Sequence, residues 1–248
     1  MARSRGYAPF ESSPGQDALL DQIIAHATTA GSNGVGVFDL DGCLFDTRPR
    51  QVKIIREYAS IHDALDLYCI REEHFTDWSL ATTMRNAGIP EERIQSLKQA
   101  LADFWFKRFF QSEYVVHDHA MPGAVDLVKR CHAAGLKIAY LTGRDINMRA
   151  GTLQSIEAWG FPLDGQDARL FTKPTFEMDD TEYKDQALLE IANMATPVLF
   201  MDNEPANVNK FRERHPESLV VFVETDHSPR KDEPHSEIPW LRSFSRSA

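Results

Sequence analysis

The sequence predicts an α/β fold in which a parallel sheet lies between two layers of helices. Between residues 121 and 223, short apolar segments typical of buried strands alternate with longer segments of helical periodicity. Strands separated by helices usually join as parallel crossovers, which gives a doubly wound, three-layer architecture. One further apolar strand, residues 35–38, precedes a mostly helical stretch at residues 47–119. The core is therefore expected to carry a helical insertion after its first strand.

Length and composition are those of an ordinary globular protein. The chain has 248 residues, of which 42% are hydrophobic and 26% charged, enough for one core domain of about 150 residues plus an insertion. Its net charge of −10 disfavours broad binding to nucleic acid or anionic membranes, although it does not exclude a local basic site. The odd number of cysteines, three, disfavours a disulfide framework. With no apolar signal segment and no membrane-length apolar run, we expect a cytoplasmic enzyme without a membrane partner.

The N-terminal region is expected to be disordered over residues 1–16, which are rich in Ser, Gly and Pro. Apolar residues at helical spacing predict a helix over residues 16–29. The glycine cluster at residues 31–36 precedes a strand, so it indicates a turn and not a dinucleotide-binding loop.

Within the insertion, helical periodicity covers residues 50–59, 65–87 and 90–111, and the first strand-like segment after it is residues 114–116. The insertion is large enough to be a small helical domain. Because it directly follows a loop rich in carboxylates, we expect it to act as a lid.

The remaining core elements alternate in the expected manner. The C-terminal tail from residue 226 is polar and proline-rich until an apolar patch at residues 238–241, which is expected to dock on the body. Predicted helices are residues 122–134, 149–159 and 183–193, and predicted strands are residues 137–141, 169–172, 197–201 and 219–223.

Two carboxylates and a glycine follow the first strand directly, as Asp39, Asp41 and Gly42. If the strand ends at Asp39, the two carboxylates can converge, and a hard cation such as Mg²⁺ suits that pair. Gly42 permits positive φ, which could aim successive backbone N–H groups at phosphate oxygens. Metal, carboxylates and anion site together indicate phosphoryl transfer.

Two structural alternatives compete with this interpretation. A calcium loop fails because Cys43, Leu44 and Arg50 stand where it needs an oxygen ligand, glycine and glutamate. A surface turn with two solvated aspartates remains open on this motif alone.

Three further strand ends carry polar residues. Thr142, Gly143 and Arg144 follow one strand, a second leads through Lys173 towards Lys184, and Asp202 follows a third. In a parallel sheet all these loops fall on the same edge as Asp39. Four convergent polar loops indicate a site.

These motifs, in this order, resemble those of the haloacid dehalogenase superfamily, a group of Mg²⁺-dependent phosphotransferases with a Rossmann-like core. The resemblance covers residues 35–46 and 121–223. It implies a catalytic core at residues 35–46 and 120–225, a helical cap domain at 47–119, an N-terminal extension and helix at 1–34, and a tail at 226–248.

The resemblance also implies roles for the carboxylates. Asp39 is similar to the family's nucleophile, which forms an aspartyl-phosphate, and Asp41 to its general acid and base. Asp39, Asp41 and Asp202 are the implied Mg²⁺ ligands. Because an alkoxide leaving group needs a proton and a halide does not, an acid at Asp41 favours phosphate esters over haloalkanoates. The usual second acidic residue after Asp202 is missing, so Glu204 or Asn207 is left to orient a metal-bound water.

The phosphate-binding residues implied by the resemblance are Thr142, Gly143 and a lysine. Lys173 and Lys184 both remain candidates, with Lys184 favoured because a helix start also supplies N–H donors. Arg144 could hold a distal substrate group or pair with Asp145.

Two other patterns have structural explanations. The histidines at 117 and 119 have a zinc-like spacing but lack a third ligand, so a hinge segment is favoured. The aromatic residues at 104–110 suggest base stacking, yet such a stripe more often forms a core.

The sequence thus predicts an Mg²⁺-dependent phosphatase acting on a small phosphomonoester. A phosphomutase and a polynucleotide 3′-phosphatase of the same superfamily are the rival enzymes, the latter opposed by the acidic composition. A non-catalytic phospho-ligand module is disfavoured, because a binder needs neither nucleophile nor proton donor. Substrate identity and oligomeric state stay open.

Overall fold

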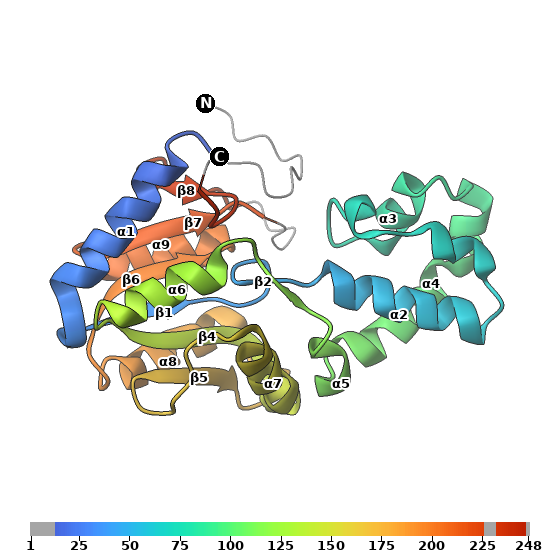
Figure 1. Ribbon diagram of the computed structural model, residues 1–248. Coiled ribbons are helices and arrows are strands. Elements are labelled where there is room, and N and C mark those ends of the chain that lie inside the picture. Colours follow the sequence, from blue (N-terminus) through green and yellow to red (C-terminus); the bar gives the residue numbers. More distant parts are fainter. Residues whose placement is uncertain (1–12, 226–231, 247–248) are drawn as a thin grey trace.

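A six-stranded parallel sheet forms the centre of the protein (Figure 1). The structure, a computed structural model, describes residues 13–225 and 232–246, and the sheet is taken from these. Its strand order is β5-β4-β1-β6-β7-β8, with β1 in the interior, where every residue of the strand is buried. The strands are β1 (Gly34–Phe38), β4 (Lys137–Asp145), β5 (Ala168–Lys173), β6 (Thr196–Asp202), β7 (Leu219–Val223) and β8 (Trp240–Leu241).

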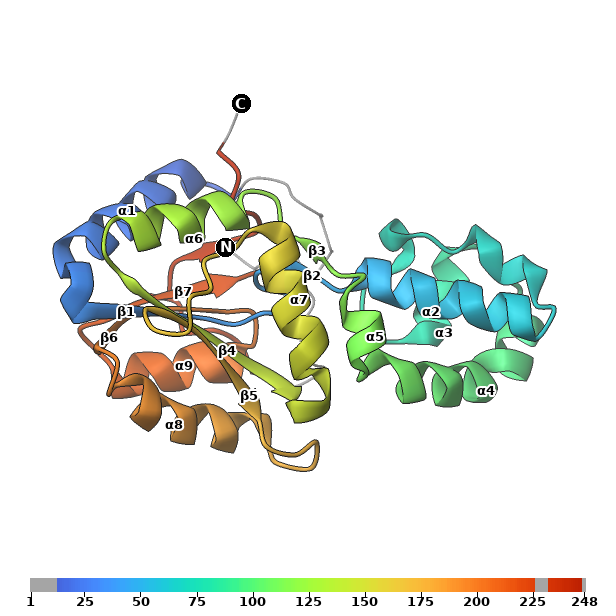
Figure 2. The ribbon, with the colours of Figure 1, turned by 60° about the horizontal axis from the view of Figure 1, so that its bottom comes forward.

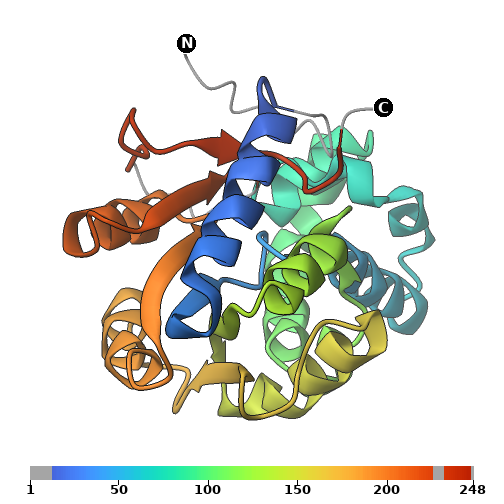
Figure 3. The same cartoon turned by 60° about the vertical axis from the view of Figure 1, so that its left-hand side comes forward.

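Helices cover both faces of the sheet, as the views in Figures 2 and 3 show. One hydrophobic cluster joins one face to α1, α6 and α7, and a second joins the other face to α8 and α9. This confirms the three-layer α/β prediction. The helices are α1 (Gln16–Ala30), α6 (Ala124–Ala133), α7 (Arg149–Trp159), α8 (Asp180–Ile191) and α9 (Pro205–Arg214), with short 3₁₀ turns η1 (Gly31–Asn33) and η4 (Ile146–Met148).

The insertion is helical and has a hydrophobic cluster of its own, built from residues between Val52 and Leu101. In Figures 1 and 2 it lies beside the sheet domain. The two chain crossings that connect it to the core pair with each other as an antiparallel ribbon of β2 (Phe45–Asp46) and β3 (His119–Ala120). Its elements are α2 (Arg48–Ile61), η2 (Leu65–Cys69), η3 (Glu72–His74), α3 (Leu80–Asn86), α4 (Glu91–Phe109) and α5 (Ser112–Val115).

Several local expectations differ from the structure. Residues 114–116 belong to the short helix α5 and its end, not to a strand, because they pack as a helical turn against α7. Residues 65–87 contain two 3₁₀ turns before α3 begins at Leu80, so helical periodicity predicted too long a helix in that segment. Helix α9 has no counterpart among the helices predicted from the sequence.

The apolar patch in the tail docks as expected, and it does so as a sixth strand. β8 pairs in parallel with β7, and Ile238, Leu241 and Phe244 are buried. The expectations for residues 1–12, and for the tail at 226–231, lie outside the described residues. Across the described ranges, no helix has both the length and the apolar character needed to cross a membrane.

Helices α5 and α7 meet at a position where only glycine fits. A Cβ added to Gly151 on α7 would lie 2.2 Å from the backbone oxygen of Ser112, and the N–H of Gly151 donates to the Ser112 hydroxyl at 3.0 Å. This contact joins the end of the insertion to the core.

We therefore expect Gly151→Ala to lower the free energy of unfolding by about 1–3 kcal/mol, because backbone must shift to admit the methyl group. Urea unfolding measures the change. Ala158→Ser, at an exposed position on the same helix, is the control and should change stability by less than about 0.5 kcal/mol. Equal stability of the two variants would show that the α5–α7 contact tolerates separation.

Candidate functional site

The polar loops predicted to converge do meet at the carboxyl edge of the sheet. They line a cavity of about 400 Å³, into which side chains from the core and the insertion both project. Its lining residues are Asp39, Asp41, Trp78, Phe109, Phe110, Thr142, Gly143, Arg144, Met148, Asp180, Thr181, Lys184, Asn203, Glu204 and Asn207.

Lys184 lies between two buried carboxylates. Its Nζ donates to Oδ1 of Asp39 at 2.6 Å and to Oδ2 of Asp202 at 2.7 Å. Asp39 is the residue after β1, Asp202 is the last residue of β6, and Lys184 lies in the first turns of α8. Asp202 also accepts from the side-chain amide of Asn207 at 3.0 Å and from the backbone N–H of Glu204 at 2.8 Å.

The charge in this triad does not balance. Two carboxylates share one ammonium group, which leaves a formal charge of −1 when all three groups are ionised. Burial raises the pKa of Asp39 well above its usual value; Lys184 opposes this rise, while Asp202 and Asp41 add to it. Burial favours a neutral Lys184, but Asp202 and Asp39 override it and raise the pKa of the ammonium group. The site can therefore accept one further proton or cation next to Asp39.

Asp39 is positioned by β1 and a tight loop after it. The backbone N–H of Asp39 donates to Met201 O at 2.9 Å, which extends the pairing of β1 with β6 by one residue. Gly42 has φ 73°, the positive value expected for it. However, the N–H groups of Gly42 and Cys43 donate to Phe45 O and Leu40 O, so they close the loop and do not form the expected anion nest.

Thr142 and Gly143 lie in an irregular part of β4, where its register with β5 shifts. Both line the cavity, and the Thr142 hydroxyl accepts from the backbone N–H of Arg144 at 3.2 Å. A Cβ added to Gly143 would lie 2.5 Å from Oδ2 of Asp180, so the start of α8 presses directly against this loop. A larger residue at this position would displace the Asp180 side chain from its contact with the loop.

The two candidate lysines occupy different places. Lys173 is outside the cavity lining, and its Nζ donates to Phe176 O, Met178 O and Asp180 Oδ1, the last at 2.6 Å. It therefore closes the loop between β5 and α8. Lys184 alone of the pair contacts Asp39.

Asp41 lines the same cavity, but its carboxylate turns towards two guanidinium groups. Arg144 donates to it from Nε at 3.0 Å and from a terminal nitrogen at 2.5 Å, and Arg50 donates at 2.8 Å. Both arginines also donate to Asp118, at 2.7 and 2.8 Å. Two carboxylates and two guanidinium groups thus form a balanced, largely buried cluster, the four-residue network.

The network sets the ionisation of its acids. Burial alone would raise the pKa of Asp41, but Arg144 and Arg50 override it and hold the pKa well below the usual range. Burial raises the pKa of Asp118 to about 6, against the opposing effect of the same arginines. Asp41 is therefore ionised near neutral pH, and the arginines that keep it ionised also weaken it as a base.

Sequence reasoning missed Arg50 and Asp118. Arg50 is fully buried near the start of α2, and Asp118 is 1% exposed next to β3, so the network ties both crossings of the insertion to β4. No sequence pattern singles out Asp118, which lies between the two histidines, although the predicted hinge places it next to the core. Within the described residues, the ion-pair partners of Arg144 are Asp41 and Asp118, and not the neighbouring Asp145.

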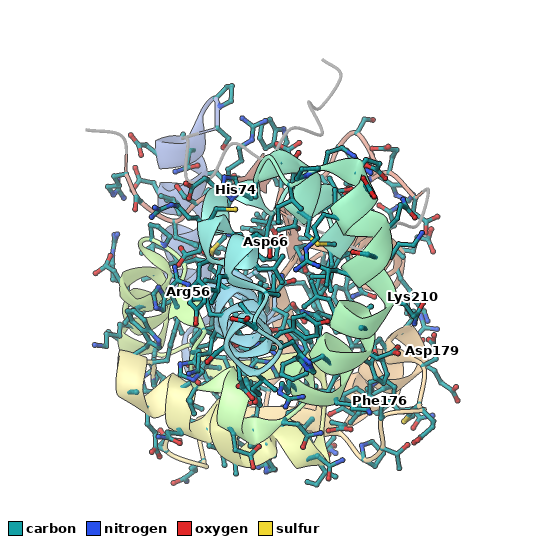
Figure 4. All side chains as sticks on the ribbon, turned by 90° about the vertical axis from the view of Figure 1, so that its right-hand side faces the viewer. Arg56, Asp66, His74, Phe176, Asp179 and Lys210 are labelled. Atoms are coloured by element: carbon teal, nitrogen blue, oxygen red, sulfur yellow. The ribbon has the colours of Figure 1, made fainter. Side chains whose placement is uncertain are left out.

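The aromatic side chains of α4 pack in two different places. Phe104 packs against the cluster of the insertion, as expected for a core residue. Phe109 and Phe110, at the end of the helix, line the cavity together with Trp78. Figure 4 shows Phe176 on the core loop before α8, and its ring centroid lies 4.9 Å from that of Phe110.

The three predicted metal ligands do not form one cluster. Asp39 and Asp202 flank Lys184, whereas Asp41 pairs with arginines. No group of three or more His, Cys, Asp or Glu side chains within residues 13–225 and 232–246 is placed to hold an ion. The Asp39–Asp202 pair nevertheless fits a hard cation. Its ligand atoms would be carboxylate oxygens, and together with Lys184 the pair keeps a formal charge of −1.

The network predicts that Arg50→Met lowers the free energy of unfolding by about 3–5 kcal/mol, because it leaves buried Asp118 with one partner fewer. The matched control is Arg85→Met, which removes an ion pair with Glu91 whose side chains are 54% and 53% exposed. That control should cost less than about 1 kcal/mol in the same urea titration. Similar midpoints for both variants would contradict a stabilising role for the network.

Several solved structures are similar to this chain at low sequence identity. Protein tyrosine kinase A of Mycobacterium tuberculosis superposes with a TM-score of 0.51 at 15% identity, covering 86% of this chain and 95% of that one. The class C acid phosphatase of Bacillus anthracis with tungstate bound gives 0.41 at 18% identity, covering 78% of this chain and 65% of its own length. L-2-haloacid dehalogenase of Xanthobacter autotrophicus gives 0.45 at 18% identity, covering 77% of each chain.

Sequence comparison identifies the family. No curated protein matches the chain. A family model described as haloacid dehalogenase-like hydrolase matches residues 36–200, well over half of the 248 residues, and this range includes the loops of Asp39, Thr142 and Lys184. The chain belongs to the haloacid dehalogenase-like hydrolases.

Proposed function

We propose that this protein is a phosphomonoester hydrolase in which Asp39 attacks phosphorus and forms an aspartyl-phosphate. The observation that carries the proposal is the contact of Lys184 with both Asp39 and Asp202 at the cavity edge. An ammonium group at Asp39 can offset the charge of an incoming phosphate, which a carboxylate alone would repel. In the attack, an Asp39 oxygen bonds to phosphorus as the ester oxygen leaves; water then cleaves the new bond, releasing phosphate and restoring Asp39.

The proposal assigns phosphoryl oxygens to Lys184 and to the loop at Thr142 and Gly143. Lys184 supports this assignment because it contacts the proposed nucleophile, whereas Lys173 is committed to the loop before α8. The packing of Gly143 against Asp180 holds that loop in place. Preorganised donors of this kind need no rearrangement as charge develops on the phosphoryl group.

Asp41 is the proposed proton carrier, and its surroundings add a requirement. As long as Arg50 and Arg144 bind it, Asp41 is ionised but is a weak base, because both guanidinium groups stabilise the carboxylate. To protonate a leaving oxygen in the first step, or to accept a proton from water in the second, it must part from at least one arginine. Arg50 belongs to the insertion, so a movement of the insertion relative to the core would loosen Asp41.

We accordingly propose that residues 47–119 form a cap over the cavity. Trp78, Phe109 and Phe110 of this segment already line it, opposite the carboxylates of the core. The β2–β3 ribbon is the only pair of strands by which the described chain enters and leaves the segment, so rotation about it is the simplest motion available.

Mg²⁺ is the proposed cofactor, held by the carboxylates of Asp39 and Asp202. When bound it would neutralise the excess charge of the pair and of a phosphate. Asp41 could join these ligands only if its side chain left the arginines. Asn207 and Glu204 bond Asp202 and would orient it.

The nucleophile is tested by trapping it. Borohydride reduces an acyl phosphate to an alcohol, so adding it during turnover should change the mass of the peptide containing Asp39 and of no other acidic peptide. Asp39→Asn should remove the labelling and lower kcat by a factor of about 10³ or more. The control variant Asp180→Asn, which removes a carboxylate at the cavity edge, should still be labelled on the peptide that contains Asp39. Near-normal turnover by Asp39→Asn would exclude this residue as nucleophile.

The metal is tested by titration. Asp202→Ala should raise the Mg²⁺ concentration needed for half-maximal activity by about tenfold or more, because one of two proposed carboxylate ligands is lost. Asp167→Ala, which removes a half-exposed carboxylate preceding β5 at the other edge of the sheet, should leave that concentration unchanged. Full wild-type activity in excess chelator would contradict a metal requirement.

A further inference from the structure

The insertion presents a wall of aromatic rings to the carboxylates. Trp78 and Phe110 line the cavity with Phe109, and Trp78 is 38% exposed, so its ring is available to a ligand. The ring centroids of Trp78 and Phe109 are 5.9 Å apart and those of Phe109 and Phe110 5.1 Å, both edge to face. These three rings, the aromatic wall, are continuous.

The aromatic wall is braced from behind. Trp105 stacks on Phe109 at 4.4 Å with an interplanar angle of 22°, and the Arg50 guanidinium lies 4.1 Å above the same ring. Phe176 from the core contacts Phe110 edge to face. Rings fixed in this way can bind another flat ring at little cost in side-chain entropy.

The cations of the cavity lie on its core side. They are Arg144 of β4 and Lys184 of α8, and each is already bound to two carboxylates. A phosphate group is therefore expected at the core side of the cavity, with the rest of the ligand at the aromatic wall.

From this arrangement we infer that the substrate is a monophosphate ester whose leaving group carries a flat aromatic ring. This inference rests on the proposed function for its phosphate half and on the aromatic wall for the rest. The phosphate lies at Asp39 and Lys184, and the ring packs against Trp78 and Phe110.

The substrate test compares esters that differ only in the ring. Benzyl phosphate and cyclohexylmethyl phosphate share their charge, ester linkage and approximate size, and the wall variants and phosphonates below control for the somewhat better leaving group of the benzyl ester. Wild-type protein should show about tenfold higher kcat/KM for the benzyl ester, the size expected for one or two aromatic contacts.

Substitutions in the aromatic wall test whether its rings cause the preference for the benzyl ester. Trp78→Leu and Phe110→Leu keep an apolar side chain but remove a ring, so each should lower the benzyl-to-cyclohexylmethyl ratio to about threefold or less. The control is Tyr68→Leu, which removes a ring 45% exposed on η2, outside the cavity lining; its ratio should equal that of wild type. Nucleoside 5′-monophosphates form a second arm, and a preference for them over benzyl phosphate would place the ring one sugar away from phosphorus.

Binding separates this inference from the proposed function. Calorimetry with the non-hydrolysable benzyl and cyclohexylmethyl phosphonates measures ring recognition without turnover. If no ester is hydrolysed but benzyl phosphonate binds about tenfold more tightly, and Trp78→Leu abolishes the difference, the hydrolase proposal fails and the ring site stands. Equal binding of the two phosphonates, or a preference that survives both wall variants, overturns the ring site even in an active phosphatase.

Discussion

Compensation of buried negative charge is the constraint on which the arrangement of this protein depends. Asp39 and Asp202 leave the sheet at neighbouring strands, and without Lys184 between them two adjacent carboxylates would be buried unpaired. Breaking such a pair costs several kcal/mol, so α8 must begin close to the carboxyl edge of the sheet. Asp179 caps that helix through two backbone N–H groups, and Lys173 anchors its first residue. The loop before α8 is therefore as important as the strands for placing Lys184 between the two carboxylates.

A second set of compensating charges couples the insertion to the core. Arg50 comes from the insertion, Arg144 from β4, and Asp41 and Asp118 accept from both. Because the network is balanced, it is stable as it stands and does not call for a metal. It also makes the protonation state of Asp41 depend on where the insertion lies, which links lid position to proton transfer in the proposed mechanism.

The insertion combines two tasks on one helix. The middle of α4 supplies Leu97 and Leu101 to the insertion's own cluster, while its last turn supplies Phe109 to the cavity. A helix of this length can do both because it extends beyond the elements that cover its middle. The shared rings mean that folding of the insertion and shaping of the cavity are not independent.

The sequence by itself determined the architecture and the edge at which the site lies. Short apolar runs and helical periodicity are local, so they identified strands β1, β4, β5, β6 and β7 and most core helices. The parallel-sheet rule then brought Asp39, Thr142, Lys184 and Asp202 together. The local patterns failed where tertiary contacts override local preference, as in α5, or where a strand is as short as β8.

Only the tertiary structure decided the partners within the site. Arg50 lies 68 residues from Asp118 and Arg144 lies 103 from Asp41, and pairing over such separations has no local signature. For the same reason the sequence could not foresee that Asp41 faces arginines instead of Asp39, nor decide between Lys173 and Lys184. A side chain's direction is set by the lowest free energy of the whole charge cluster, and that cluster exists only once the chain has folded.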